Sequence, residues 1–459
     1  MESISGMRDR RSETGTDTCT ASLDISCPVS KNQKGELDPL EFTAIKGFKD
    51  ILPSEVEPWQ RLEAAAREIF AAFNFSEIKP PAMEWTELFS RSIGQDTDIV
   101  SKEMYTIHDS KGRGMTLRPE ATASITRAYI QNRLYQENPV QKLFVTGPMF
   151  RHENPQKGRF RQFHQIDAEI FGDPGPLSDA DLIVMLLHLF ESLSISGLTL
   201  HLNSLGCPVC RTGFRSALRD YLEHRSQGLC ADCTRRAGTN PLRVFDCKVE
   251  GCRDLVEGAP SVLDYLCGDC RGHFDRLQGL LAEAGVSYVV NPRLVRGLDY
   301  YTRTAFEVQT ERLGAQNAVA GGGRYDGLIK ELGGPDHPAI GFAVGVERLI
   351  ALMHDNRAPE EQTPALFVAA LGEEASRRAF AWVTGLRKAG LRVEMDYASR
   401  SLKSQMKRAD RIGARRVLIV GEDELASGRG LLRDMETKAQ EEIPLEGLIE
   451  RLSRLVKSS

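Results

Sequence analysis

The sequence predicts a mixed α/β protein: an α+β body built on an antiparallel sheet flanked by helices, followed by a smaller α/β unit. Two patterns support this prediction. Apolar residues 143–150 and 163–171 flank a segment with a proline and a glycine, which is typical of a hairpin of two antiparallel strands. After residue 364, apolar runs alternate with helical segments, which indicates a parallel sheet covered on both faces. At 459 residues, the chain should form two or three domains.

The composition is that of a soluble globular protein, with 41% hydrophobic and 27% charged residues. No apolar run approaches the ~20 residues that a membrane helix requires. The N-terminal segment has no hydrophobic signal core, and its scattered acids argue against a transit peptide. We therefore expect a cytoplasmic protein that does not enter a membrane. The net charge is -5, but residues 377–416 hold twelve Lys or Arg against three acids, so that segment is an ordinary solvated surface or faces a polyanion.

The predicted hairpin carries polar side chains on one face. Because side chains alternate between the faces of a strand, its odd-numbered positions can lie together, and six of these seven are polar. A solvated face would explain the charges, but not Phe163 among them. Guanidinium groups suit phosphate oxygens and an aromatic ring suits a purine, so the pattern favours a nucleotide site. The odd positions are Arg151, Glu153, Arg161, Phe163, Gln165, Asp167 and Glu169, and the cations are Arg151, Lys157, Arg159 and Arg161.

Before the hairpin, the chain begins with a segment that we expect to be disordered. Residues 1–43 are rich in Ser, Thr and Asp and lack hydrophobic periodicity. Residues 56–73 then have apolar side chains at helical spacing, with Pro58 in the first turn. Residues 77–84 contain two prolines and predict an extended segment.

A second helix is predicted at residues 121–134, and a long apolar helix at residues 177–193. Glu120 and Thr122 lie at the start of the first of these. A carboxylate and a hydroxyl at such a turn commonly cap the helix. A buried cation would also require an acidic partner, so a binding role remains open.

Eight of the ten cysteines lie in residues 198–272, in four close pairs. Close pairs of this kind resemble thiolate zinc sites, and structural disulfides are not expected in a reducing cytosol. The count suits two sites of four cysteines, and the alternative is free or redox-active thiols. Cys19 and Cys27 lie in the tail and are incidental. The pairs are Cys207 and Cys210, Cys230 and Cys233, Cys247 and Cys252, and Cys267 and Cys270.

Three further stretches complete the body. Residues 294–308 hold two adjacent tyrosines near an arginine, which in isolation would suggest core aromatics. Residues 320–327 are glycine-rich and predict a tight backbone bend that allows close approach to a ligand. Residues 339–353 predict a strand that runs into a helix with Arg348 in its first turn, where a cation opposes the helix dipole and should have a ligand or partner.

These stretches resemble the motifs of class II aminoacyl-tRNA synthetases, and specifically histidyl-tRNA synthetases. Phe150-Arg-His-Glu153, the basic loop and the returning strand resemble motif 2. The helix and strand within residues 56–84 resemble motif 1, the homodimer seam, and residues 339–353 resemble motif 3. Residues 294–308 match the histidine-specific signature. Residues 320–327 would line the amino-acid pocket.

The resemblance spans about residues 45–450 and implies the domain organisation. Residues 44–357 would form the catalytic domain, with residues 198–272 as a cysteine-rich insertion, and residues 364–459 the anticodon-binding domain, after a proline-rich linker. The implied activity joins L-histidine to ATP with Mg²⁺ and then transfers the histidyl group to tRNA-His. Structural Zn²⁺ in the insertion is not a general requirement of this family.

The resemblance also assigns residues to the site. Arg151 and Arg296 would be catalytic at the α-phosphate and carboxylate. Glu169 and Tyr301 would recognise the two nitrogens of the imidazole ring. Histidine-binding residues would be Glu120, Ala121, Thr122, Arg151, Gln165, Glu169, Arg296, Tyr300 and Tyr301, and ATP-binding residues Arg151, Glu153, Arg159, Phe163 and Arg348.

Two other functions are compatible with parts of the sequence. A regulatory paralogue that senses histidine would keep the fold, but such paralogues usually lose the anticodon-binding domain and several ATP contacts, which this chain keeps. A zinc-dependent nucleic-acid binder would explain the cysteines and the basic helices but not the histidine signature.

Overall fold

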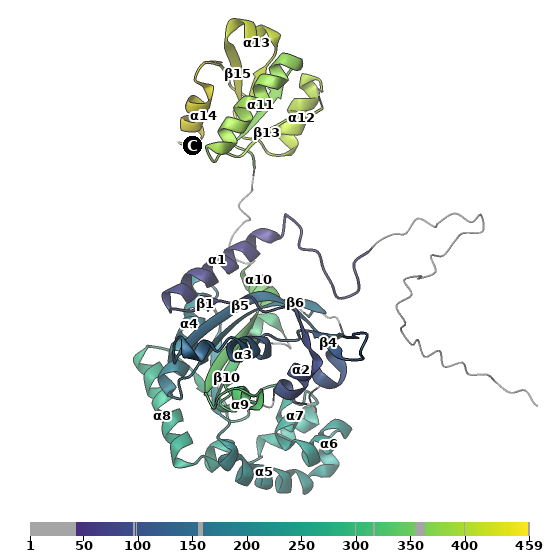
Figure 1. The fold of residues 1–459 in the computed structure, drawn as a ribbon, viewed down its shortest axis with the longest axis vertical. Coiled ribbons are helices and arrows are strands. Elements are labelled where there is room, and N and C mark those ends of the chain that lie inside the picture. The colour runs from purple at the N-terminus through teal and green to yellow at the C-terminus, as the bar shows by residue number, and fades with distance from the viewer. Residues whose placement is uncertain are drawn as a thin grey trace, which may run out of the picture. The chain divides into compact units, whose positions relative to one another are not determined.

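A computed structural model describes residues 43–457 except for 95–96, 98, 155–158, 299, 315–316, 354–362 and 399. The predicted N-terminal tail, Lys157 in the hairpin loop and most of the predicted linker therefore lie outside the described residues. The chain divides into two compact units (Figure 1). One contains Phe70–Leu186 and Gly197–Arg348, and the other contains Leu349–Ser459 together with Pro53–Ile69 and Leu187–Ser196.

The first unit is built on a sheet of eight strands in the order β1-β5-β6-β11-β10-β9-β7-β8. The six inner strands pair antiparallel, whereas the short edge strands β1 and β8 pair parallel. The predicted hairpin is present as β5 and β6, with Phe150 opposite Gln162. The strands are β1 Ser76–Glu77, β5 Gln141–Phe150, β6 Gln162–Phe171, β7 Thr199–Ser204, β8 Val289–Val290, β9 Thr302–Gln309, β10 Ala318–Arg324 and β11 Ala339–Gly345.

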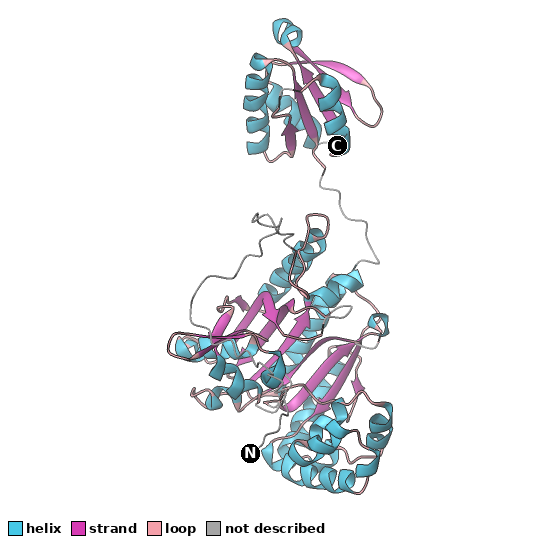
Figure 2. Ribbon diagram, turned by 90° about the vertical axis from the view of Figure 1, so that its right-hand side faces the viewer, coloured by secondary structure: helices cyan, strands magenta, loops and turns pink. Residues whose placement is uncertain are grey.

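Helices flank this sheet, as the sequence predicts (Figure 2). The predicted helices are present, and the one after Glu120 ends early because Arg133 adopts a left-handed conformation, with φ of 53°. None of the helices in the described ranges is both long and apolar enough to span a membrane. The helices wholly within the first unit's ranges include α2 Thr86–Ile93, α3 Thr122–Gln131 and α9 Leu328–Glu331, and a small sheet there holds β2 Met83–Trp85, β3 Thr106–His108 and β4 Gly114–Leu117. Three further helices, α1 Val56–Ala72, α4 Pro176–Ser192 and α10 Val346–Met353, extend across the bounds between the ranges of the two units.

The cysteine-rich insertion lies between β7 and β8 and is helical. It has a small core of its own, around Phe214, Leu218, Cys233, Val244 and Cys252. Figure 1 shows its helices α5, α6 and α7 gathered beside one another. The elements are α5 Pro208–Glu223, α6 Ala231–Thr239, α7 Glu250–Glu257 and α8 Gly268–Glu283, with short 3-10 helices η3 Ser226–Gly228, η4 Pro241–Asp246 and η5 Val262–Tyr265.

The second unit contains the predicted α/β sheet, in the strand order β13-β12-β14-β15-β16. The first three strands are parallel, and separate apolar clusters cover the two faces of the sheet. Two antiparallel strands, β15 and β16, extend the sheet and were not predicted, because their sequences are mostly polar. The elements are β12 Leu366–Ala370, α11 Glu373–Lys388, β13 Val393–Met395, α12 Leu402–Arg411, β14 Arg416–Val420, α13 Glu422–Ser427, β15 Arg429–Asp434, β16 Gln440–Pro444 and α14 Leu448–Lys457.

The glycine-rich segment differs from its prediction. Residues 320–327 were expected to bend, but Ala318–Arg324 form β10, an inner strand, and none of its glycines has a positive φ. The expected close approach is nevertheless present. A Cβ on Gly321 would overlap the guanidinium of Arg296, and one on Gly322 would overlap the carbonyl oxygen of Gly341. The glycines therefore provide room for side chains and neighbouring strands rather than for a turn.

Candidate active site

A cavity of about 300 Å³ opens on the face of the large sheet in the first unit. Its wall combines the odd-numbered residues of β6, the start of α3, the segment before β9, and strands β9 to β11. The predicted hairpin face is therefore a site wall rather than a solvated surface. The predicted residues that line it are Glu120, Thr122, Arg151, Glu153, Arg159, Phe163, Gln165, Glu169, Arg296, Tyr300, Tyr301 and Arg348.

Ala121 is the predicted site residue that does not line the cavity. It precedes Thr122 at the start of α3, and its side chain is fully buried in the apolar core. Its two neighbours point into the cavity wall. Arg161, on the same hairpin face, donates instead to the backbone oxygen of Glu153 at 3.1 Å.

One end of the cavity holds a buried cluster of three carboxyl groups, Glu120, Asp167 and Glu169. Thr122 Oγ1 donates to Glu169 Oε1 at 2.6 Å, and Tyr325 OH donates to Glu169 Oε2 at 2.5 Å. Burial raises the pKa of Glu169 to about 8. Burial, and then the neighbouring Glu169 and Glu120, raise the pKa of Asp167 well above its ordinary range. A cationic or hydrogen-bond-donating ligand would stabilise the ionised forms.

Glu120 has the capping role that the sequence left open, and its second oxygen remains available. One oxygen, Oε1, accepts a hydrogen bond from the backbone N–H of Ala123 at 3.0 Å and so caps α3. The other oxygen, Oε2, is buried and has no hydrogen-bond partner among the described residues. Burial raises the pKa of this carboxyl. Helix capping therefore leaves one oxygen available to a ligand.

Arginines line another part of the wall. Arg151 Nε donates to the backbone oxygen of Pro119 at 2.9 Å, and its guanidinium lies 5.1 Å from the ring centroid of Phe163. Arg159 Nη1 donates to Glu153 Oε2 at 2.7 Å. Burial, and then the nearby Arg159, lower the pKa of Arg348, whose Nη1 donates to the backbone oxygen of Ala318. Three cations in one wall make it suited to an anionic ligand.

The segment with the two tyrosines lies beside the carboxyl cluster. The rings of Tyr300 and Tyr301 are 4.7 Å apart, and Tyr300 lies 5.4 Å from Tyr325. Arg296 Nη1 donates to Glu307 Oε2 at 2.6 Å, and its guanidinium lies 5.9 Å from the Tyr301 ring. The arginine is thus held at the junction between the acidic pocket and the arginine-lined wall.

Several of the buried polar side-chain atoms that have no hydrogen-bond partner line this cavity. Among the described residues, they include Glu120 Oε2, Gln165 Oε1, Asp167 Oδ2 and Arg296 Nε. Folded proteins satisfy nearly all buried polar groups, so several such atoms in one cavity indicate a site for a polar ligand. The atoms are of both signs, which matches a ligand that carries a cation and an anion.

The sequence prediction missed several residues of the site. Tyr325 lies within the glycine-rich residues 320–327 but was not predicted as a site residue, and Asp167 was predicted only to lie on the hairpin face. Glu307 lies within residues 294–308, the stretch that resembles the histidine-specific signature, but it was not predicted as a site residue. Glu347 was also missed, although it accepts from the backbone N–H of His164 at 2.9 Å and so joins the start of α10 to β6.

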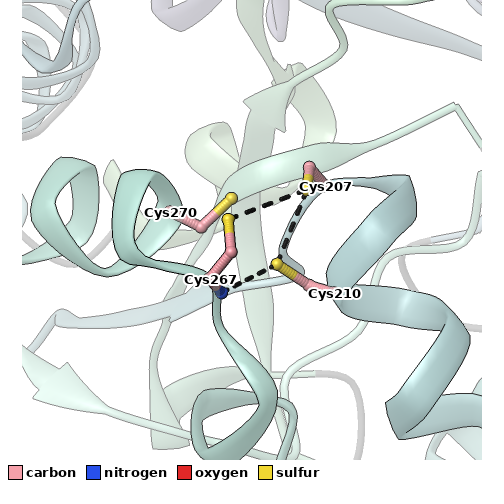
Figure 3. Close-up of side chains that lie close together, drawn as sticks. All are labelled: Cys207, Cys210, Cys267 and Cys270. Carbon is pink, nitrogen blue, oxygen red and sulfur yellow. Dashed lines mark hydrogen bonds between the residues drawn. The ribbon is translucent and has the colours of Figure 1, made fainter.

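The eight insertion cysteines form two groups of four, in which the sulfur atoms lie within 4.8 Å of one another. One group joins Cys207 and Cys210 at the start of α5 to Cys267 and Cys270 at the start of α8 (Figure 3). In it, the sulfurs of Cys207 and Cys210 are 3.5 Å apart, and those of Cys207 and Cys267 are 4.0 Å apart. The other group consists of Cys230, Cys233, Cys247 and Cys252.

The geometry of both groups fits a metal bound by four thiolates. Metal–sulfur bonds of about 2.3 Å in a tetrahedron place the sulfurs roughly 3.8 Å apart, close to the observed separations. Backbone N–H groups donate to the sulfurs, from Cys267 to Cys210 at 3.1 Å and from Cys230 to Cys252 at 3.2 Å. The backbone N–H of Cys233 lowers the pKa of Cys230 to about 7, which favours the thiolate.

Comparisons with known proteins agree with this geometry. The family model of histidyl-tRNA synthetase matches residues 47–349, and that of the anticodon binding domain matches residues 365–455. A histidine–tRNA ligase of Desulfatibacillum aliphaticivorans is 57% identical over 412 residues, which cover 90% of this chain and 98% of that protein. One of Desulfosudis oleivorans is 58% identical over 402 residues, with 87% and 95% covered. The crystal structure of apo histidyl-tRNA synthetase from S. aureus has 34% identity and a TM-score of 0.76, covering 90% of this chain and 100% of that chain.

The antiparallel sheet, with buried acids and arginines in one cavity, defines the catalytic body of a class II aminoacyl-tRNA synthetase. The chain belongs to the histidyl-tRNA synthetase family. A regulatory paralogue is not favoured, because relatives that are 57% and 58% identical over most of this chain are named histidine–tRNA ligase. A zinc-dependent nucleic-acid binder would not explain the family match.

Proposed function

We propose that this protein activates L-histidine with ATP to form histidyl-adenylate and then transfers the histidyl group to tRNA-His. The proposal rests on one observation, which is that a buried acidic pocket adjoins a wall of arginines within the same cavity. The acidic pocket suits the ammonium and imidazole of histidine, and the arginine wall suits a triphosphate. The family match and the relatives named histidine–tRNA ligase support this assignment.

Histidine would be recognised by groups that pair with each of its polar atoms. Glu120 Oε2 would accept from the α-ammonium, alongside Thr122. Glu169 would accept from one ring N–H, and Tyr301 would pair with the other ring nitrogen, while Gln165 and Tyr300 complete the pocket. A site that pairs with a substrate's polar atoms rejects analogues that lack them by about 10⁴–10⁵.

ATP would occupy the arginine wall. Phe163 and Arg348 would stack on the two faces of the adenine, Glu153 would accept from its amino group, and Arg159 would bind the outer phosphates. Mg²⁺ prefers carboxylate and phosphate oxygens, so the ATP phosphates would be its main ligands, because the Glu307 carboxylate in the wall already accepts from Arg296 and Gln309. When bound with the phosphates, the ion supplies positive charge that offsets theirs.

The first reaction needs no nucleophile from the protein. The histidine carboxylate attacks the α-phosphorus of ATP, a bond to the α-phosphate forms, and pyrophosphate leaves. Arg151 and Arg296 would orient the carboxylate and the α-phosphate and stabilise the negative charge that gathers on the phosphate oxygens. The ribose hydroxyl at the end of tRNA-His would then attack the acyl carbon and release AMP.

The test is ATP–pyrophosphate exchange with each of the twenty amino acids. We expect exchange with histidine, and we expect Arg296→Ala to lower its rate by about 10²–10³ while the protein remains folded. Arg312→Ala, at an exposed arginine outside the cavity, is the control and should keep the wild-type rate. Near-normal exchange by Arg296→Ala would remove its catalytic role, and a wild-type protein without histidine-dependent exchange would refute the function itself.

The remaining assignments concern the molecule beyond the cavity. The protein would act in the cytoplasm as a homodimer through the motif 1 helix and strand, residues 56–84. The domain bounds would be 44–357 for the catalytic domain and 364–459 for the anticodon-binding domain, in which the basic helices would face tRNA. Each group of four cysteines would hold one structural Zn²⁺, which would cross-link short helices of the insertion.

A further inference from the structure

The insertion touches the segment that carries Arg296. We call residues 291–298, between β8 and the gap at residue 299, the signature loop. Within it, the Arg293 side chain reaches the end of α7. Its Nη1 donates to the backbone oxygen of Pro260 at 2.9 Å, and its Nη2 donates to the backbone oxygens of Glu257, at 2.7 Å, and Ala259. Its guanidinium also lies 5.3 Å from the Phe245 ring centroid. One side chain therefore fixes the loop to three carbonyls, where the helix dipole favours a cation.

A second contact involves η4 of the insertion. A Cβ on Gly297 would lie 3.9 Å from Arg243 Nη1, so the side chain of this η4 residue reaches the loop backbone. Leu242 and Arg243 line a small cavity of about 30 Å³ together with Arg296 and Tyr301. The carboxylate of Asp246 interacts electrostatically with both Arg243 and Arg296. The insertion therefore contributes charge and packing directly beside the predicted catalytic arginine.

The second group of cysteines holds these parts of the insertion together. Cys247 follows η4 directly, and Cys252 lies in the first turn of α7. The two elements have 6 and 8 residues, and isolated helices of that length are not stable in water. The apolar core around them is small, and small cores usually need a cross-link. A metal bound to Cys230, Cys233, Cys247 and Cys252 would supply it.

We propose that this half of the insertion positions the signature loop for histidine activation, with Arg293 as the positioning residue for Arg296 and the second cysteine group as the support. The inference rests on the proposed function, because it requires that Arg296 act on histidine and ATP. It places the effect of the insertion in the first reaction, before tRNA is involved. An insertion that served only to contact tRNA would leave that reaction unchanged.

Arg293→Ala tests the inference by ATP–pyrophosphate exchange and by calorimetric titration of histidine without ATP. We expect kcat/KM for histidine to fall about 10- to 100-fold, as for other supporting contacts of a site, while KM for ATP changes by less than about threefold. Arg293→Lys keeps a donor and should restore part of the loss. Arg235→Ala is the control, because that exposed arginine of α6 pairs with Asp232, away from the loop.

The outcomes separate this inference from the proposed function. Wild-type exchange with histidine, together with a folded Arg293→Ala protein of unchanged kcat/KM, would overturn the inference alone. Absence of histidine-dependent exchange in the wild type would overturn both. If Arg293→Ala does not fold, kcat/KM for histidine and KM for ATP are measured for Phe245→Ala and Arg293→Lys instead. A lower kcat/KM for histidine with an unchanged KM for ATP would support the inference, and no change in either quantity would overturn it.

The proposed support of the signature loop by the second cysteine group is tested with Cys247→Ser. We expect bound zinc to fall by about one equivalent, the melting temperature to drop, and calorimetric histidine affinity to weaken at temperatures where the protein remains folded. Cys19→Ser, in the N-terminal segment, is the control. Loss of zinc with unchanged histidine affinity would overturn the role of the metal, and an unchanged zinc content would overturn its assignment to these residues.

Discussion

At the scale of single residues, the site depends on carboxyl groups that are costly to bury. Glu169 accepts from Thr122 and Tyr325, yet burial still raises its pKa to about 8. Groups of this kind are retained where a ligand will pair with them, at a cost in the stability of the free protein. In the proposed complex, the ring N–H of histidine would offset that cost.

The cost can be measured as a pH dependence. Between its ordinary value of 4.5 and about 8, Glu169 keeps a proton in the folded protein that the unfolded chain has released. The free energy of unfolding therefore falls as pH rises through this range, by about 1.4 kcal/mol per pH unit from this group. Because glutamine cannot ionise, we expect Glu169→Gln to melt at a higher temperature than the wild type near pH 8, with a smaller difference near pH 6.

Thermal unfolding of both proteins across that pH range, without ligand, checks this expectation. Glu436→Gln, at an exposed carboxylate in the second unit, should follow the wild-type profile. Melting curves for Glu169→Gln and the wild type that keep a constant separation would show that Glu169 does not hold the proton.

The residue scale also shows where sequence reasoning is limited. The alternation of polar residues in the hairpin predicted which side chains of β6 share a face, because a strand has a period of two. Glu307 and Tyr325 could not be found in this way. Their roles come from strand order, which brings β9 and β10 beside β11 and β6, and no local pattern encodes that order.

At the scale of elements, β10 allows the predicted close approach through a strand instead of through the predicted turn. Its glycines were predicted to make a turn, but they keep an inner strand free of side chains so that Arg296 can lie against it. The predicted close approach is present, but the predicted bend was wrong, because glycine is compatible with both a turn and a strand. Helices were predicted more closely, since amphipathic or apolar runs of this length have few alternatives.

Gly321→Ala tests this explanation. The new Cβ would overlap the Arg296 guanidinium, so we expect this arginine to move and the rate of histidine-dependent ATP–pyrophosphate exchange to fall about 100-fold. Gly279→Ala is the matched control, because it lies in α8, where an added Cβ would meet no other atom within 4 Å. That change should leave exchange unaltered and stabilise the helix by about 0.5–1 kcal/mol. Equal exchange rates for the two variants would argue against a role for β10 in placing Arg296.

At the scale of the whole molecule, the proposed site of the chemistry and the match to the anticodon binding domain lie in different parts of the chain. The cavity lies within the first unit, and the basic helix α12 belongs to the second. Patterns in the sequence predicted the large antiparallel sheet and the smaller α/β sheet, whereas the antiparallel strands β15 and β16 were missed because their sequences are mostly polar. The cysteine count predicted two groups of four, and only the fold showed which pairs combine.

Charge reversal on α12 tests this separation. Lys403→Glu with Lys407→Glu should weaken binding of tRNA-His and reduce the dependence of that binding on salt, because phosphate contacts release counterions. Histidine-dependent exchange without tRNA should be unchanged. Lys438→Glu with Arg451→Glu, at exposed positions outside α12, controls for the same change in net charge. Unaltered aminoacylation by the double variant at low tRNA concentration would remove α12 from the tRNA interface.

The first cysteine group has a consequence for how this architecture arose. Cys207 and Cys267 are 60 positions apart in the chain, but their sulfurs are separated by only 4.0 Å. The segment between these two cysteines therefore begins and ends at nearly the same point. A segment with adjoining ends can be acquired, lost or exchanged during evolution with little disturbance to its host. The insertion is therefore a segment that could be transferred between neighbouring strands of another protein.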